Sequence, residues 1–581
     1  MSEGGEEAFP RLSPEDAPAG GTPRHRFLPE GLEWLPAILL AASWIPRIAF
    51  WLRRDYNHDD LGFAWGTWQR AMGARVGVDL YGYGFVFLFT EILKPLFRWF
   101  PESFFPLDFA RCIILVAQIV NIHFVYRISR KLGAEKKWAL AACSVAAWQP
   151  DLILRAGDVR TDPLGACCLL AAANLLLNEA SWHRAERIGL LLGLAIILDY
   201  KFGVASPFAA LAVVLIAWPA FWRPVLRLTA GATAVVVVYL GWLIHADTWA
   251  GFSSGLRQTF TSLQVGAAKQ AGVSPGQIFH LSPLTFGFMA LGAIGLMCSL
   301  PLPGGRKRAA YASIVVFFLC VFVKLNPYFF PYNFNLFAPL LATMIPGIVF
   351  LSGLLRMKGR AVALVLLLAC MTSAGEGLPA LGKALSRTNA AQKRIVRWIW
   401  KATAPDEHVF DWLGMALDRP GVYHWWLFSG LRPVYQSGRW YSVADELQRY
   451  RVTLLISNYR LAWLNPSDLA YVQSHYVWID SCLLSPGQVF RSSDVGGGGS
   501  VKFVPAVEGE YRFDPRGISG LLVDGRAPGP TFRLSREFHE LSREGNSPLP
   551  PVFAVVYSTA LRERNPDRPC PADQPLFYGF D

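Results

Sequence analysis

The chain has 581 residues, of which 53% are hydrophobic and only 17% are charged. Soluble proteins carry about 25% charged residues, so this composition argues against a wholly soluble protein. The formal net charge is +12, but the basic residues stand in short clusters between apolar runs, as in the cytoplasmic loops of membrane proteins. We interpret the charge as a sign of membrane topology and expect no nucleic-acid partner.

The first 30 residues are rich in Pro, Gly, Glu and Arg and lack apolar periodicity, which predicts a disordered cytoplasmic tail. Residues 31–376 hold long apolar runs, and a membrane-spanning helix needs about 20 such residues. This part is therefore predicted to be an α-helical polytopic bundle with about 11 or 12 spans. The predicted spans begin near Leu32, Phe109, Trp138, Pro163, Ile188, Ala205, Leu226, Pro283, Ala309, Leu336 and Ala361.

The stretch Tyr81–Phe100 is apolar but contains Glu91, Lys94 and Arg98, so it is either a further span or a helix in the membrane interface. Every second loop is basic, which predicts a cytoplasmic N-terminus in an inner, cytoplasmic membrane. The remaining loops and the region after residue 376 then share the outer, periplasmic or extracellular face. Arg53, Arg54, Arg70 and Arg75 fall outside against the charge rule, which a lipid phosphate bound there would explain.

The region after residue 376 has the composition of a soluble protein. Residues 377–495 alternate strand-like and helical segments, which predicts a periplasmic α/β subdomain. Residues 496–581 show short strands separated by turns, which predicts a small subdomain resembling a β-sandwich. Ala390–Trp400 has the pattern of a basic amphipathic helix at a membrane surface. Cys482 and Cys570 could pair if this region lies outside the cytoplasm.

The first outer loop contains His58-Asp59-Asp60, followed by a helical pattern. A carboxylate there could accept a proton from an alcohol or hold a metal. An acidic N-terminal cap of the helix explains the same residues at least as well. Both interpretations stay open from the spacing alone.

Three further outer loops carry polar side chains. The segment from Arg155 to Asp162 could bind an anion through its arginines or form a structural ion-pair cluster. Lys201 could bind a phosphate or extend to the membrane interface. The aromatic loop with Tyr332 and Asn333 could contact a sugar or belong to an aromatic belt.

The order of these motifs resembles the GT-C superfamily of membrane glycosyltransferases, in particular its protein mannosyltransferase and aminoarabinose (lipid A) transferase branch. The first outer motif is His58-Asp59-Asp60 with Trp68 and Gly73 after it, and here Asp59-Asp60 replaces the frequent Asp-Glu. The similarity covers most of the membrane half and extends to the tail segment Ala404–Tyr476. The later motifs are Arg155–Pro163, Asp199–Gly203 and Pro331–Pro339.

The resemblance implies transfer of a sugar from a polyprenyl-phosphate donor to a lipid, polysaccharide or protein acceptor outside the cytoplasm, with inversion of configuration. Asp59 would be the general base, and Asp60 would support it. The donor phosphate would meet Arg155, Arg160 and Lys201. A divalent cation is left open, since some members of the superfamily use one. The substrate-binding residues would be His58, Asp158, Asp162, Tyr332 and Asn333.

Two other classes of protein fit parts of the pattern. A transporter or glycolipid flippase would also have about a dozen spans and ionisable residues near them. However, no internal repeat is visible, and the outer charges lie in loops on one face. A non-catalytic assembly protein or polysaccharide-binding protein would use the β-rich tail as its working part.

Overall fold

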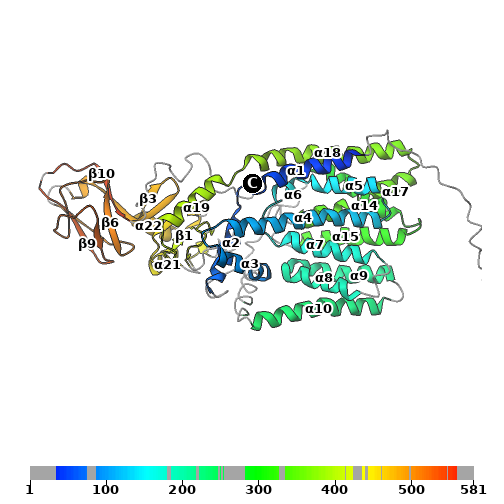
Figure 1. Ribbon diagram of the computed structural model, residues 1–581, viewed down its shortest axis with the longest axis horizontal. Coiled ribbons are helices and arrows are strands. Elements are labelled where there is room, and N and C mark those ends of the chain that lie inside the picture. Colours follow the sequence, from blue (N-terminus) through cyan, green and yellow to red (C-terminus); the bar gives the residue numbers. More distant parts are fainter. Residues whose placement is uncertain are drawn as a thin grey trace, which may run out of the picture.

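The computed structural model is an elongated molecule, with a helical bundle at one end and a strand-rich tail at the other (Figure 1). The predicted disordered tail, residues 1–30, lies outside the described residues. The structure describes residues 34–74, 87–178, 185–217, 221–245, 249, 253, 282–325, 334–411, 414–422, 435–438, 442–458, 461–495, 499–545 and 547–558.

The bundle helices run roughly side by side, and each predicted span start lies on a helix or a few residues before one (Figure 1). The helices are α1 Leu35–Phe50, α4 Phe105–Lys131, α5 Lys136–Ala147, α6 Pro150–Leu154, α7 Asp162–Leu176, α8 Ala185–Leu198, α9 Ala205–Ala217, α10 Trp222–His245, α14 Pro283–Cys298, α15 Gly305–Leu325, α16 Phe334–Ala342, α17 Gly347–Leu354 and α18 Gly359–Ser386.

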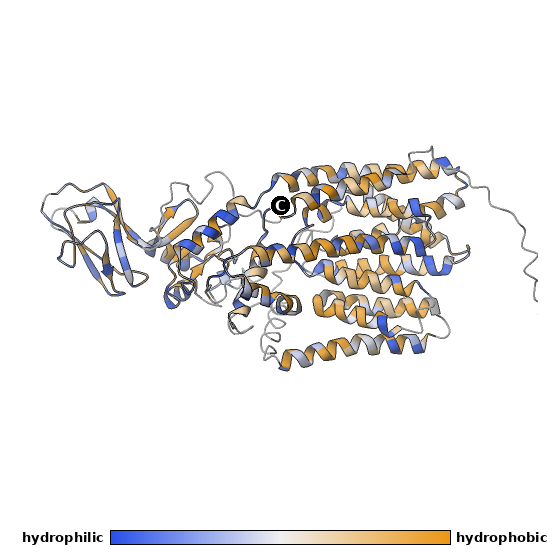
Figure 2. Ribbon diagram, viewed as in Figure 1, coloured by the Kyte–Doolittle hydropathy of each residue, from blue (hydrophilic) through white to orange (hydrophobic). Residues whose placement is uncertain are grey.

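Within the described residues, four helical segments are long and apolar enough to cross a membrane: 105–131, 222–245, 335–354 and 359–402. Apolar residues run along the bundle helices, whereas hydrophilic residues gather at the helix ends and in the tail (Figure 2). Since apolar side chains such as Val238 (73% exposed) and Phe317 (55% exposed) point outward, the bundle is suited to a surrounding of lipid. The prediction of a polytopic helical membrane protein is confirmed.

Glycines bring two helix pairs of the bundle into close contact. A Cβ atom on Gly292 of α14 would overlap the carbonyl oxygen of Met344, and one on Gly347 of α17 would overlap the carbonyl of Gly292. Gly189 of α8 meets the backbone of Leu228 on α10 in the same way. Small residues at crossing points let helix backbones pack tightly in a membrane, where no hydrophobic effect drives association.

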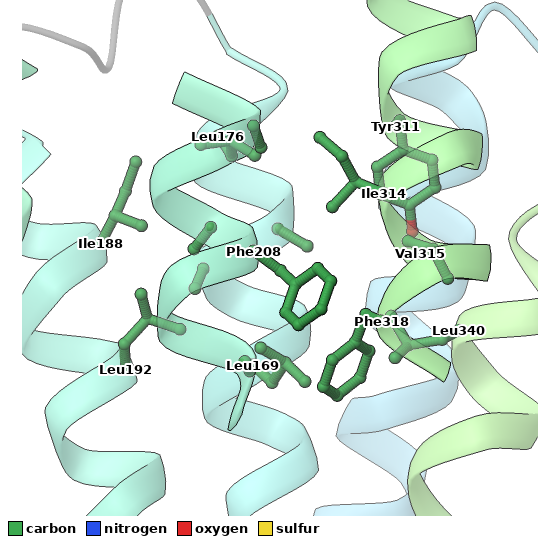
Figure 3. A pocket seen from close by; sticks show the side chains of 15 residues that line it. Leu169, Leu176, Ile188, Leu192, Phe208, Tyr311, Ile314, Val315, Phe318 and Leu340 are labelled. Atoms are coloured by element: carbon green, nitrogen blue, oxygen red, sulfur yellow. The ribbon is translucent and has the colours of Figure 1, made fainter. Parts of the chain in front are cut away.

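An apolar cavity of about 70 Å³ lies between α7, α8, α9, α15 and α16. The side chains of Leu169, Phe208, Phe318 and Leu340 surround it (Figure 3). The hydroxyl of Tyr311, which also lines it, is hydrogen-bonded to Thr343 Oγ1 at 2.9 Å. A cavity with such a lining stays dry.

Two further helices lie at the end of the bundle next to the tail (Figure 1). They are α2, His58–Ala71, and α3, Phe87–Trp99, which packs against α2 and α4. Glu91 of α3 accepts from Arg70 Nη2 of α2 at 2.8 Å and pairs with Lys94 at 2.7 Å. This position beside α2 favours the interface helix over a further span for this stretch.

The tail contains helices and two sheets. Its helices are α19 Ala390–Ala402, α21 Val443–Arg449 and α22 Pro466–His475. Its strands are β1 Val409–Phe410, β2 Leu454–Ile456, β3 Tyr476–Asp480, β4 Leu483–Arg491, β5 Ser500–Phe503, β6 Gly509–Asp514, β7 Leu521–Val523, β8 Phe532–Leu534, β9 His539–Arg543 and β10 Val552–Tyr557.

A seven-stranded sheet has the order β1-β2-β4-β10-β6-β8 with β3 on β4, and β5-β9-β7 form a second sheet. The parallel pair β1–β2 with α21 between them is the predicted α/β feature, and the strands from β4 to β10 are the predicted β-rich feature. Strand β4 pairs with β2 on one side and with β10 on the other. Both halves therefore share one sheet, and the boundary near residue 496 stays a prediction.

Helix α19 joins the bundle to the tail (Figure 1). Its buried residues include Ile395, Val396 and Ile399, so its apolar face packs on protein. Its N-terminal end is fixed to the segment that follows α1, because Asn389 N donates to Arg53 O at 2.8 Å and Gln392 Nε2 donates to Tyr56 O at 2.8 Å.

The tail also docks on α2 through residues 414–421. Trp65 Nε1 of α2 donates to Arg419 O at 3.1 Å, and Gly414 and Gly421 lie against the Trp65 side chain. The Arg419 guanidinium is fully buried and pairs with Glu102, ahead of α4, at 2.8 Å. The tail thus contacts α2 and the segment ahead of α4 directly.

We expect Gly421→Val to weaken this docking, because a Cβ atom there would overlap the ring of Trp65. Overpacking of this kind costs about 1–3 kcal/mol. Thermal unfolding and limited proteolysis of the detergent-solubilised protein should show a lower unfolding temperature and faster cleavage between bundle and tail. Gly382→Ala on α18 is the control, because a Cβ atom there meets nothing within 4 Å. Equal behaviour of the two variants would contradict the docking role.

Candidate active site

The first turn of α2 presents two adjacent carboxylates at the end of the bundle next to the tail. Asn57, not an aspartate, caps the helix: its Oδ1 accepts from Asp60 N at 2.8 Å, and Asn57 N donates to Asp60 Oδ2 at 3.2 Å. This reciprocal pair is a capping box. The acidic N-cap suggested by the sequence is therefore wrong in its residue: Asn57 is the N-cap, and Asp60, at the third position of the helix, completes the capping box.

Asp60 is fully buried and connects α2 to the loop between α6 and α7. Its Oδ1 accepts the N–H of Val159, and its Oδ2 pairs with Arg111 of α4 at 3.2 Å. Burial raises the pKa of Asp60 to about 7, while Arg111 and the two N–H donors act in the opposite direction. A carboxylate enclosed in this way holds the structure together and has no open side for a substrate.

Asp59 points elsewhere and forms an ion pair with Arg160. The two side chains are 15% and 17% exposed, so this pair is more accessible than the one at Asp60. Arg160 Nε also donates to Asp162 Oδ2 at 2.8 Å. The first and second predicted motifs therefore meet, with a carboxylate and a guanidinium in contact at the accessible edge of the cluster.

Arg155 and Asp158 belong to the same cluster. Arg155 Nη1 donates to Asp158 Oδ2 at 3.3 Å, and Arg54 Nη2 lies 3.4 Å from Asp158 Oδ1. This ion pair gives a protein partner to Arg54, one of the four arginines expected outside against the charge rule. The loop can be both an ion-pair cluster and an anion site. Its carboxylates fix the positions of the arginines, and those arginines could then bind an anion.

Six of the ten predicted site residues are described with their side chains, and the structure gathers them in one cluster: Asp59, Asp60, Arg155, Asp158, Arg160 and Asp162. The side chains of the others are not described. His58 is the first residue of α2, and Lys201 lies in a short 3-10 helix, Tyr200–Val204. Tyr332 and Asn333 lie outside the described residues.

Two residues near the cluster were not singled out from the sequence. Asn335, two residues after the predicted Asn333, is buried, and its Oδ1 accepts from Gln118 Nε2 at 3.3 Å. Gln118 Nε2 also donates to Arg155 O at 3.2 Å, so it links Asn335 to the cluster. Arg111 of α4 is fully buried against Asp60. Its signal in the sequence is an arginine near the start of a long apolar run, which marks a functional position in many membrane proteins.

The described carboxylates do not form a metal-ligand set. Within the part of the chain that the structure describes, no three His, Cys, Asp or Glu side chains are grouped closely enough to hold a metal ion. Asp59, Asp60, Asp158 and Asp162 each face a guanidinium. These residues therefore suit an anionic ligand held by arginines better than a cation, and we derive no step through a metal.

No protein-family model matches the sequence, and no curated protein matches it significantly. Solved structures of membrane glycosyltransferases are nevertheless similar in fold. ArnT from Cupriavidus metallidurans bound to undecaprenyl phosphate has a TM-score of 0.53 and 12% identity, with 78% of this chain and 98% of that chain covered. The apo form of the same ArnT has a TM-score of 0.51 and 12% identity, with 78% and 97% covered.

Two less similar structures belong to the same structural class. The archaeal oligosaccharyltransferase AglB from Archaeoglobus fulgidus has a TM-score of 0.49 and 13% identity, with 77% of this chain and 72% of that chain covered. The arabinofuranosyltransferase AftD from Mycobacteria has a TM-score of 0.45 and 13% identity, with 88% and 40% covered. The fold of this chain is therefore the GT-C fold, as the two ArnT structures show.

We expect the two adjacent aspartates to differ in their effect on stability. Asp60→Ala leaves the buried Arg111 without its carboxylate, and breaking a buried pair costs about 3–5 kcal/mol. Asp59→Ala leaves Arg160 with Asp162 as its partner and partly accessible to water, so the loss should be smaller. Thermal unfolding of the two purified variants measures the difference. A loss for Asp59→Ala as large as that for Asp60→Ala would contradict the division of roles.

Proposed function

We propose that this protein is a glycosyltransferase that moves a sugar from a polyprenyl-phosphate donor to an acceptor on the non-cytoplasmic face of the membrane. One observation carries the proposal: Asp59 and Arg160 meet at the accessible edge of a buried ionic cluster, at the outer end of a bundle with the GT-C fold. A base and a cation in contact at such an edge are what transfer of a sugar from a lipid phosphate needs.

The chemistry follows from these two groups. Asp59 accepts the proton of the acceptor hydroxyl as its oxygen bonds to the anomeric carbon of the donor sugar. The bond between that carbon and the phosphate oxygen breaks at the same time, and its electron pair leaves with the polyprenyl phosphate. Arg160 and Arg155, together with Lys201, stabilise the charge on the leaving phosphate. Asp59 is freed for this step when the donor phosphate takes over Arg160.

The other residues of the cluster have supporting roles in this proposal. Asp158 and Asp162 accept from Arg155 and Arg160 and hold them in orientation. Asp60 supports Asp59 from the next position on α2. His58, Tyr332 and Asn333 are assigned to the sugar or the acceptor by their place in the motifs alone.

Two observations support the choice of donor. The fold extends over nearly the whole length of an enzyme solved with undecaprenyl phosphate. The arginine side of the cluster lies at the outer end of spanning helices, where a phosphate attached to a membrane-embedded chain would reach it. A transporter would instead need two alternating openings around a central site.

The orientation is part of the proposal: a cytoplasmic N-terminus in the inner membrane, with the tail in the periplasm or outside the cell. The basic loops support it through the charge rule. Cys482 also supports it, because this tail cysteine is disulfide-bonded and disulfides persist in oxidising compartments. Cys570, its expected partner, lies outside the described residues.

Removing the carboxylate of Asp59 should abolish transfer but should not lower the amount of protein in the membrane. In a deletion strain, the wild-type gene should restore the glycan or glycolipid that mass spectrometry finds missing. Asp59→Asn should not restore it, although this variant should reach wild-type levels in the membrane. Asp445→Asn, an exposed aspartate on α21, is the control and should restore it fully. A functional Asp59→Asn variant would instead favour a scaffold that needs no base.

The displacement should invert the configuration at the anomeric carbon, because the hydroxyl activated by Asp59 attacks opposite the phosphate held by the arginines. NMR spectroscopy of the donor and of the isolated product compares the two anomeric configurations. Retention would exclude a single displacement and would require a nucleophile that binds the sugar covalently.

A further inference from the structure

Arg111 uses all three guanidinium nitrogens on the protein itself. Its Nε donates to Gly157 O at 3.1 Å, Nη1 donates to Arg54 O at 2.9 Å, and Nη2 donates to Asp55 O at 2.6 Å. Nη2 also lies 3.2 Å from Asp60 Oδ2, and the side chain has no exposed surface. Arg111 is therefore closed to ligands, and its contacts are all structural.

These partners belong to two different outer segments. Arg54 and Asp55 lie in the connection between α1 and α2, and Asp60 lies in the first turn of α2. Gly157 lies in the loop between α6 and α7, two residues after Arg155. The N–H of Val159 completes the link from this loop back to Asp60. A single guanidinium on a spanning helix thus joins the segment that holds Asp59 to the loop that holds Arg155 and Arg160.

We propose that Arg111 is a positioning residue for the transfer reaction, and that Asp60 is its partner in this role. Together they fix the offset between the α2 terminus and the loop, so that Asp59 and the two arginines face one donor phosphate. The inference rests on the proposed function, and it reassigns Asp60 from support of the base to placement of the loop.

The shape of the side chain matters as much as its charge. A guanidinium is a rigid planar fork with five N–H donors, whereas an ammonium is a point charge on a flexible stem. Arg111→Lys keeps a cation beside Asp60 but cannot reach the carbonyls of both segments at once. The loop then loses its fixed position while the buried charge stays neutralised. A small misplacement of reacting groups costs a large factor in binding and rate.

The test separates positioning from mere stability. Full-length protein in lipid nanodiscs is titrated with undecaprenyl phosphate, and the dissociation constant is measured for wild type, Arg111→Lys and Ile114→Ala. Ile114 is a fully buried residue one turn further along α4, so its truncation destabilises the same helix but removes no hydrogen bond to either segment. Unfolding temperatures of the variants are measured in parallel to match their stabilities.

We expect Arg111→Lys to bind undecaprenyl phosphate about tenfold more weakly than wild type or worse. Ile114→Ala should bind as the wild type does despite a similar loss of stability. If Arg111→Lys does not fold, Asp60→Asn replaces it, because the amide keeps the size and the acceptor for Val159 N–H but removes the charge beside Arg111. It too should bind more weakly than Ile114→Ala.

Two results would contradict the proposal in different ways. If the wild type binds tightly and Arg111→Lys binds as Ile114→Ala does, the positioning role is wrong and the proposed donor stands. If the wild type itself does not bind undecaprenyl phosphate, the proposed donor is wrong, and this inference is wrong with it.

Discussion

The end of the bundle next to the tail depends on one buried ion pair, between Arg111 and Asp60. Neither side chain has any exposed surface, and an unpaired charge in such a place would cost several kcal/mol. The chain avoids this cost by surrounding both groups with donors and acceptors from three segments. Because these partners are mainly backbone atoms, the pair determines where the segments lie and not only where two side chains meet.

This constraint divides the two adjacent aspartates between different tasks. Helix geometry places successive side chains about 100° apart, so Asp59 and Asp60 cannot face the same surroundings. Asp60 turns inward to Arg111, and Asp59 turns to the accessible Arg160. The buried position holds the helix in place, and the neighbouring position carries the group suited to chemistry. The capping box at Asn57 strengthens this arrangement, because it fixes the rotation of the first turn.

The fold was predictable where the information is local. Runs of apolar residues give the span starts, and the alternation of basic loops gives the common face of the two motifs, which the Asp59–Arg160 contact agrees with. The role of Arg111 could not be predicted, because its partners lie 46 to 57 residues away along the chain. Sequence periodicity indicates only contacts between residues a few positions apart. The sequence alone could not identify Asn57 as the N-cap, because asparagine and aspartate both favour helix starts and only the hydrogen bonds decide between them.

The tail is attached to the same two segments of the chain. It is joined to the segment after α1 through Asn389 and Gln392, and to α2 through Trp65 and Arg419. Both attachments are made to the α1–α2 connection and to α2, which Arg111 of the bundle also contacts. The α2 terminus is thus held between the bundle and the tail, with Asp59 at the junction. Because the tail contacts the helix that carries Asp59 in this way, removing the tail should disturb the geometry around Asp59.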